Sequence, residues 1–353
     1  MWSYLIQDPA RGSNTFCRKG NVFLSGIIFG KIRIDEIKVL IVTDLLNVYL
    51  ASPRGFCAGV ERAIETVKLS LSKYGQPVYV LHEIVHNKHV IDELKQAGAV
   101  FVEHLADVPN GEVCVFSAHG VSLGVESYAK ELGLRTVDAT CPLVTSVHRM
   151  VEKYHQQGTE VIIVGHHNHP EVEGTAGRVQ GGVQIVATEE EAEHIQISDP
   201  LAVGYVTQTT LCKKDVEGII AILKKRFPGI QGPRSNICFA TQNRQDAVRL
   251  LAAKSELIFV VGSKNSSNSN RLREVASSCK VKAYLVDDYE DIEEKWLSGV
   301  KTIGITAGAS APERLVEGVI SWLGLKRQVV VEELDGVEET IHFQPALISE
   351  HSK

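Results

Sequence analysis

Residues 138–171 have the sequence D-A-T-C-P-L-V-T-S-V-H-R-M-V-E-K-Y-H-Q-Q-G-T-E-V-I-I-V-G-H-H-N-H-P-E. A cysteine is followed by a helix-like segment, a glycine, a strand-like apolar run and a polar turn that ends at Glu171. The turn contains His166, His167 and His169, a density that is typical of a local metal site. The rest of the chain favours a different interpretation, because the same pattern occurs twice more.

The three copies align without a gap and begin at Cys57, Cys141 and Cys238. Twenty-four residues after each cysteine an apolar run ends, at Leu81, Gly165 and Gly262. Polar loops follow at once: H-E-I-V-H-N at 82–87, H-H-N-H-P-E at 166–171 and S-K-N-S-S-N at 263–268. A second strand-like run in each copy also ends in polar residues. Three units with unrelated polar turns are the alternative, but the agreement of cysteine and loop offsets favours an internal threefold repeat.

Strand-like runs alternate with helical patterns from Leu46 onward, which predicts α/β units with largely parallel sheets. In the first helix, apolar residues recur on one face, at positions 60, 63, 64, 67 and 71. Ligands of parallel sheets bind beyond the carboxyl ends of the strands, so the three units can converge on one shared centre. The expected divisions are an N-terminal extension at 1–45, α/β domains at 46–140, 141–237 and 238–325, and a C-terminal tail at 326–353.

Composition excludes several classes of protein. The chain has 353 residues and a net charge of −6, which gives no reason to expect nucleic acid or an anionic membrane as a partner. No apolar run reaches 18 residues, so we expect no transmembrane helix. The seven cysteines are odd in number and none is in C-x-x-C spacing, which favours a reducing compartment over a disulfide scaffold.

The three repeat-equivalent cysteines suit a soft metal centre. Zinc with an open fourth position is one possibility, and an iron–sulfur cluster with one open iron is the better interpretation if the chemistry is redox. Three unliganded thiols are the alternative, because buried cysteine is often inert. Four other cysteines are left outside the site: Cys17, Cys114, Cys212 and Cys279. Of these, Cys212 lies nearest to a polar loop.

The polar loops suit an anion. His86, His119 and His169 are candidate donors, although a single histidine is more often structural. The loop at 262–270 opens a helix and can hold an anion with hydroxyl, amide and backbone N–H groups. Ser310 is expected to cap another helix, with Pro312 at its first position. Histidine, serine and asparagine side chains together with helix dipoles in one cavity favour a diphosphate-like ligand. No Walker loop and no G-x-G-x-x-G motif follows a strand, which disfavours a nucleotide.

Glu171 is the one carboxylate in this set. Beside an anionic ligand and three thiolates its pKa should be raised, so that it could deliver protons, whereas a surface or capping glutamate is the alternative. Thr209, in the motif T-Q-T-T-L, could relay a proton through its hydroxyl.

These motifs together resemble one known family. The matching stretches include S-P-R-G-F-C-A-G-V, H-E-I-V-H-N, F-S-A-H-G-V, D-A-T-C-P-L-V, G-S-K-N-S-S-N-S-N-R-L and T-A-G-A-S-A-P. They resemble the 4-hydroxy-3-methylbut-2-enyl diphosphate reductase family, the iron–sulfur enzymes of the methylerythritol phosphate route to isoprenoids. The resemblance extends roughly from Leu46 to Phe343. Residues 1–45 depart from it, and we expect the native chain to start near Leu46.

The resemblance implies a trefoil of three α/β domains around one 4Fe-4S cluster, with the ligands Cys57, Cys141 and Cys238. It implies a diphosphate site formed by His86, His119, His169, Ser266, Ser267, Asn268 and Ser310. The allylic hydroxyl of the substrate would bind the open iron near Thr209 and Glu171, and leave as water to give isopentenyl and dimethylallyl diphosphates. Because the chain has no flavin or nicotinamide motif, electrons would come from a ferredoxin- or flavodoxin-like partner in the cytoplasm. A non-catalytic iron–sulfur sensor and a zinc hydrolase are the competing hypotheses.

Overall fold

A computed structural model describes residues 5–7, 14–18, 21–22 and 45–348. The chain divides into two compact units, Met1–Thr43 and Asp44–Lys353. In the first, β1 (Leu5–Gln7), β2 (Asn14–Arg18) and β3 (Asn21–Val22) form a small antiparallel sheet. Most of the predicted extension at 1–45 lies outside the described residues. Within the described part of the chain, no helix is both long and apolar enough to cross a membrane.

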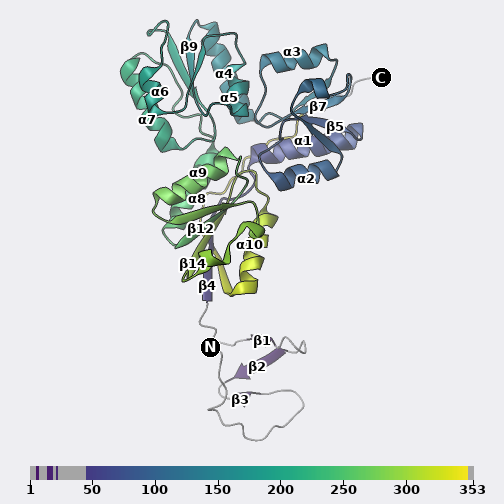
Figure 1. The fold of residues 1–353 in the computed structure, drawn as a ribbon, viewed down its shortest axis with the longest axis vertical. Coiled ribbons are helices and arrows are strands. Elements are labelled where there is room, and N and C mark those ends of the chain that lie inside the picture. The colour runs from purple at the N-terminus through teal and green to yellow at the C-terminus, as the bar shows by residue number, and fades with distance from the viewer. Residues whose placement is uncertain (1–4, 8–13, 19–20, 23–44, 349–353) are drawn as a thin grey trace. The chain divides into compact units, whose positions relative to one another are not determined.

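The second unit contains three sheets, each with its own helices, which we call the first, second and third domains (Figure 1). The first sheet has the order β6-β5-β7-β8, formed by Ala99–Val102, Val78–Leu81, Val113–Phe116 and Arg135–Asp138. The second has the order β10-β9-β11, formed by Val183–Val186, Glu160–Val164 and Val203–Thr207. The third has the order β13-β12-β14-β4-β15, formed by Lys282–Val286, Leu257–Val261, Thr302–Ala307, Leu45–Leu50 and Gln328–Glu333.

Every pairing in these three sheets is parallel, as the alternation of strands and helices predicted. Each domain starts with a helix that follows one of the repeat cysteines: α1 (Ala58–Tyr74), α4 (Pro142–Gln156) and α8 (Phe239–Ala252). The strand that follows this helix, β5, β9 or β12, lies in the middle of its sheet. Its two neighbours are the next two strands of its own domain. The threefold repeat of the sequence therefore corresponds to three domains with the same order of helix and strands.

The apolar face expected on the first helix is buried. Ala63, Ile64 and Val67 of α1 lie in the core of the first domain, and Val60 and Leu71 pack against it. The remaining helices are α2 (Lys88–Gln96), α3 (Leu123–Glu131), α5 (Pro170–Ala176), α6 (Glu189–His194), α7 (Lys213–Arg226), α9 (Ser267–Ser278) and α10 (Glu313–Lys326). Short 3-10 helices lie at Leu105–Asp107, Tyr289–Asp291 and Glu294–Leu297.

Two expected domain boundaries differ from the structure. Strand β4 pairs with β14 and β15, so it belongs to the third sheet and not to the first domain. Strand β15 lies in the segment that was expected to be a tail. The alternate residues Leu46, Val48 and Leu50 of β4 are buried in the core of the third domain, and this burial selects the partner sheet. Strand β8 was not predicted, because Val137 is its only buried residue.

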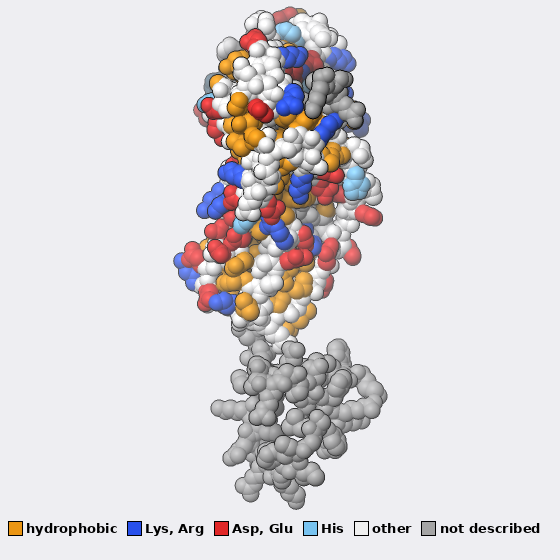
Figure 2. All heavy atoms as spheres, turned by 90° about the vertical axis from the view of Figure 1, so that its right-hand side faces the viewer, with side chains coloured by type: hydrophobic (Ala, Val, Ile, Leu, Met, Phe, Trp, Pro, Cys, Tyr) orange, Lys and Arg blue, Asp and Glu red, His pale blue; other side chains and the backbone are white. Residues whose placement is uncertain are grey.

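The last described residues return from the third domain to the first. Leu334 is buried in the third domain, whereas Ala346 and Ile348 pack against the core of the first. The backbone N–H of Ala346 donates to the Thr66 hydroxyl of α1. In Figure 1 the three domains surround a common centre, with the first in blue, the second in teal and the third in green and yellow. Acidic and basic side chains are interspersed on the face shown in Figure 2.

Candidate active site

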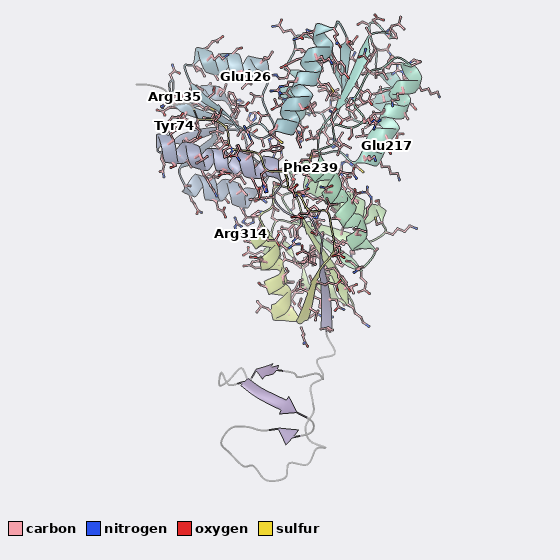
Figure 3. The ribbon with its side chains drawn as sticks, turned by 180° about the vertical axis from the view of Figure 1, so that it is seen from behind. Tyr74, Glu126, Arg135, Glu217, Phe239 and Arg314 are labelled. Carbon is pink, nitrogen blue, oxygen red and sulfur yellow. The ribbon has the colours of Figure 1, made fainter. Side chains whose placement is uncertain are left out.

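The three repeat cysteines occupy the same structural position. Cys57, Cys141 and Cys238 are the N-cap residues of α1, α4 and α8. Phe239, the first residue of α8, lies where the three domains meet (Figure 3). Helix N-termini have a partial positive charge that favours thiolate over thiol. The helices therefore present three anion-stabilising ends to one place.

Each of these cysteines is anchored on the preceding domain in cyclic order. The N–H of Cys141 donates to the carbonyl of Ala118, which follows β7 of the first domain. The N–H of Cys238 donates to Thr209, which follows β11 of the second domain, at 3.1 Å. The N–H of Cys57 donates to Ala309, which follows β14 of the third domain. Each thiol thus lies at the junction of two domains.

One cavity of about 110 Å³ lies at this centre. It is lined by residues of all three domains, and they include every site residue predicted from the sequence: Cys57, His86, His119, Cys141, His169, Glu171, Thr209, Cys238, Ser266, Ser267, Asn268 and Ser310. Further lining residues are Gly59, Val85, Thr210 and Thr241, among others. Segments that lie far apart in the chain therefore meet at the carboxyl ends of the strands, where parallel sheets bind their ligands.

Burial affects the ionisation of all three thiols. Burial raises the pKa of Cys57, that of Cys141 to about 12 and that of Cys238 to about 11, and neighbouring thiols contribute to the last two shifts. Across the described ranges, no three His, Cys, Asp or Glu side chains are grouped closely enough to hold a single ion. A Cβ on Gly59 would lie 2.6 Å from Cys141 Sγ and 3.9 Å from Cys57 Sγ. Glycine therefore keeps the space between these two thiols open.

Three histidines form a cluster on another wall of the cavity. The rings of His86 and His119 stack with centroids 4.3 Å apart, and His169 meets both edge-on at 5.8 Å. The Nδ1 of His169 accepts the backbone N–H of Glu171, so the ring proton of the neutral form is on Nε2. The Nδ1 of His86 donates to the Glu83 carboxylate at 2.8 Å, and its buried Nε2 has no partner. The cluster thus has ring nitrogens free for a ligand.

Burial lowers the pKa values of two histidines in this cluster. Desolvation, with a smaller contribution from the neighbouring imidazoles, lowers the pKa of His119 well below its usual value and that of His169 to about 4. Both rings are therefore neutral at neutral pH in the ligand-free protein. A bound anion would reverse the electrostatic part of this shift and favour protonation.

The N-terminus of α9 forms the third wall. Ser266 is its N-cap, and the Ser266 hydroxyl accepts the backbone N–H of Ser269. Asn268 is 5% exposed, and neither its amide nitrogen nor its oxygen has a partner. The Gln208 amide donates to the Thr210 hydroxyl, which donates to Ser267, so the Ser267 proton is free for a ligand. Buried polar groups are almost always hydrogen-bonded, so the isolated Asn268 side chain indicates a missing ligand.

The expected cap at Ser310 is wrong. The N-cap of α10 is Pro312, two residues later, and the Ser310 hydroxyl instead donates to the carbonyl of His86 at 2.9 Å. Proline is accommodated there because its fixed φ suits a helix start and the first N–H groups of a helix need no internal partner. Ser310 still lines the cavity, where it joins the third domain to the histidine cluster of the first.

Glu171 and Thr209 form a buried pair across the second domain. The backbone N–H and the hydroxyl of Thr209 donate to the two carboxyl oxygens of Glu171, at 2.6 and 3.0 Å. Glu171 is 3% exposed, and desolvation raises its pKa to about 7 despite these two hydrogen bonds, which lower it. The surface-glutamate alternative is therefore wrong. A carboxyl group with this pKa can hold and release a proton near neutral pH.

Comparison with known proteins identifies the fold and its family. Residues 48–324 match the family model described as LytB protein. The chain belongs to the LytB protein family. It is 63% identical over 301 residues to the 4-hydroxy-3-methylbut-2-enyl diphosphate reductase of Desulfotalea psychrophila, covering 85% of this chain and 96% of that protein. It is 56% identical to the reductase of Dechloromonas aromatica, with 84% and 98% covered.

The solved structures agree with this assignment. The reductase from Plasmodium falciparum superposes on this LytB-family chain with a TM-score of 0.81 at 38% identity, covering 84% of this chain and 93% of that one. A second solved structure, described as the terminal enzyme of the non-mevalonate pathway, gives a TM-score of 0.58 at 31% identity. The predicted family and the predicted α/β trefoil are therefore confirmed.

Other polar residues of this LytB-family chain lie outside the cavity. His167 is exposed and bonds to Glu191, whereas His166 approaches Arg271. Among the excluded cysteines, Cys114 is buried in a strand and Cys212 in the core of the third domain. Cys279 is exposed at the end of α9, and Cys17 lies in β2.

One lining residue that was not predicted is Thr241. Its hydroxyl lies 3.1 Å from the sulfur of Cys238, and its N–H donates to the same sulfur. The spacing C-x-x-T at a helix start is a capping pattern that could have identified it.

Proposed function

We propose that the chain catalyses the reductive dehydroxylation of 4-hydroxy-3-methylbut-2-enyl diphosphate to isopentenyl and dimethylallyl diphosphates, the last step of the methylerythritol phosphate pathway. The C–O bond of the allylic alcohol breaks, two electrons and two protons are consumed, and water leaves. The observation that carries the proposal is that the Glu171–Thr209 pair, the histidine cluster and the α9 N-terminus face the same cavity as three thiols. The two relatives described above are named 4-hydroxy-3-methylbut-2-enyl diphosphate reductase, which supports the proposal.

Cys57, Cys141 and Cys238 would hold one 4Fe-4S cluster, which when bound supplies electrons and an open coordination position for the substrate oxygen. The fit is supported by three helix N-termini that favour thiolates and by the space that Gly59 leaves between two of them. The three cysteines line the same cavity as Thr209 and Glu171. The thiols therefore provide a cofactor site next to a proton donor.

The diphosphate end of the substrate has three kinds of donor available. His86 Nε2 and the Asn268 amide are buried without partners, and Ser267 has a free hydroxyl proton. The α9 N-terminus adds backbone N–H groups and its partial positive charge. The Glu83 carboxylate accepts the hydrogen bond from His86 Nδ1 and so orients the ring, and Nε2 is the nitrogen that remains for the ligand. These groups orient the substrate with its hydroxyl end toward Glu171.

Glu171 is the proton source in this arrangement. With a pKa of about 7 it is partly protonated at neutral pH, and its proton can pass to the leaving oxygen either directly or through the Thr209 hydroxyl. Burial of the pair keeps bulk water away from the developing charge. Because Thr209 also accepts the N–H of Cys238, the proton donor is fixed relative to one thiol.

We infer that the electrons come from a ferredoxin- or flavodoxin-like partner in the cytoplasm, because the sequence has no nucleotide or flavin motif of its own. Within residues 45–348 all six cysteines are unpaired, which suits a reducing compartment.

The decisive experiment is anaerobic turnover with reduced viologen and 4-hydroxy-3-methylbut-2-enyl diphosphate. Iron- and sulfide-loaded protein should release isopentenyl and dimethylallyl diphosphates. Loaded protein that binds the diphosphate and forms neither product would instead support the sensor hypothesis. Glu171→Gln should retain diphosphate binding and lose most turnover, because the amide keeps the shape and the Thr209 contacts but holds no acidic proton.

A further inference from the structure

Arg244 is a fully buried cation beside the first cysteine. Its side chain lies on α8, the helix that Cys238 caps, and is 0% exposed. Its Nε and Nη2 donate to the carbonyl of Gly55 at 3.0 and 2.8 Å, and Nη2 also donates to Phe56 at 2.9 Å. Phe56 immediately precedes Cys57. The guanidinium of Arg244 thus extends from the helix that Cys238 caps and holds the backbone just before Cys57.

The remaining nitrogen of Arg244 is also satisfied. Nη1 donates to Ala240 of its own helix and to both carboxyl oxygens of Glu339, each at 3.0 Å. Glu339 lies in the segment that returns from the third domain to the first. The charge of Arg244 is thus neutralised locally, which a buried arginine requires.

Arg62 repeats this arrangement at the next cysteine. It lies on α1, the helix that Cys57 caps, and its Nη1 donates to the carbonyl of Thr140 at 2.9 Å. Its Nη2 donates to Asp138 at 3.3 Å. Thr140 immediately precedes Cys141. The two arginines therefore make equivalent contacts. Each lies on a helix that one repeat cysteine caps and donates to the carbonyl of the residue just before a different repeat cysteine.

The third junction differs. The positions of α4 that correspond to Arg62 and Arg244 are Ser146 and Val147, neither of which is a cation. At this junction Glu171 binds Thr209, whose carbonyl anchors Cys238. At this junction Glu171 therefore holds the residue that anchors Cys238, and neither corresponding position of α4 has an arginine.

We propose that Arg62 and Arg244 are positioning residues that set the separation of the three thiols. The inference rests on the proposed cluster and extends it, because neither arginine lines the cavity or touches the substrate site. Each cysteine N–H is held by the preceding domain, and at two junctions a guanidinium holds the adjacent carbonyl as well. A peptide fixed on both sides cannot rotate, so the thiol direction is fixed with it.

The test compares Arg62→Met and the double variant Arg244→Met/Glu339→Gln with wild type. The double variant avoids leaving a buried carboxylate unpaired, and Arg62, which is only partly buried, tests the equivalent contact if the double variant fails to fold. Arg226→Met is the matched control, because Arg226 also donates to two carbonyls, of Ala192 and Ile195, neither of which precedes a cysteine or lines the cavity. Arg62→Lys should restore part of the effect, since lysine supplies charge but not the planar fork.

Anaerobically loaded proteins are challenged with an iron chelator, and the electron paramagnetic resonance spectrum of the reduced cluster is recorded without substrate. Loss of two charge-assisted hydrogen bonds should accelerate iron loss about tenfold in both test variants and alter their spectra. Arg226→Met should match wild type in both measurements. Wild-type rates and spectra in Arg62→Met, or equal acceleration in Arg226→Met, would overturn the inference. Failure of the wild-type protein itself to retain iron and sulfide would count against the proposed cluster instead.

Discussion

Replacement of Glu171 by glutamine should remove a pH-dependent part of the stability of the cluster-free protein. Burial raises the pKa of this carboxyl from 4.5 to about 7. The native state therefore binds the proton more tightly than the unfolded state between these two values. The resulting stabilisation is complete below pH 4.5 and is lost as the pH rises through 7.

The magnitude follows from the two pKa values. Their difference corresponds to about 3 kcal/mol at ~1.36 kcal/mol per pH unit. Urea denaturation followed by circular dichroism, repeated between pH 4.5 and 8.5, gives the free energy of unfolding of wild type and Glu171→Gln. Glutamine is neutral throughout and keeps both contacts with Thr209. As the pH rises from 4.5 to 8.5, the free energy of unfolding of the variant should therefore increase relative to that of wild type by about 3 kcal/mol.

A parallel pH dependence of the two proteins would refute this account, because it would mean that Glu171 ionises normally in the folded state. Glu83→Gln is the control of opposite sign. The hydrogen bond from His86 lowers the pKa of Glu83, so wild-type Glu83 stabilises the protein above pH 4.5, and this stabilisation is lost as the pH falls below that value. The Glu83 variant should thus be less stable than wild type at neutral pH.

Three further predictions follow from the cavity. Gly59→Ala should destabilise the cluster-free protein, because the new methyl would lie 2.6 Å from Cys141 Sγ and 3.3 Å from Cys141 Cβ, and this crowding outweighs the ~1 kcal/mol gain in helix propensity. The displaced Cys141 thiol should also lower the iron content per chain. Asn268→Ala should raise thermal stability without ligand, by about 1–3 kcal/mol for a buried unsatisfied amide, while calorimetric titration shows weaker binding of the diphosphate. Because burial lowers the pKa of His119 and His169, diphosphate binding at pH 7 should take up protons, detectable by calorimetry in buffers of different ionisation enthalpy; binding without proton exchange would contradict it.

The sequence could predict which residues line the cavity because the repeat has a fixed internal geometry. A cysteine at a helix start and a polar loop 24 residues later are local offsets, and parallel sheets place such loops at one edge. This is why His86 and His169, in different domains, could be expected in one cavity. The side-chain distances within it were not predictable, since they depend on how the domains pack.

Other features are decided only by tertiary packing. Strand β4 has the same alternating pattern whether it pairs with β5 or with β14, so its sheet could not be chosen from the sequence. The partners of Arg62 and Arg244 are backbone carbonyls, which have no residue signature. The prediction that Ser310 is an N-cap was wrong for a local reason. In the sequence S-A-P the helix could begin after Ser310 or after Pro312, and it begins after Pro312.

The cyclic anchoring of the thiols has a consequence for how the site forms. No domain holds its own cysteine: each N–H is bound by a carbonyl of the preceding domain, so the three thiols can take their positions only after all three domains have packed. Two segments of the chain connect the third domain to the first. Strand β4 of the third sheet leads into the loop that contains Cys57, and the segment beyond β15 returns to α1. Arg244 joins these two connections, since it binds the carbonyls before Cys57 and the carboxylate of Glu339 together. Retention of the proposed cluster should therefore depend on the packing of the first and third domains as well as on the cysteines themselves.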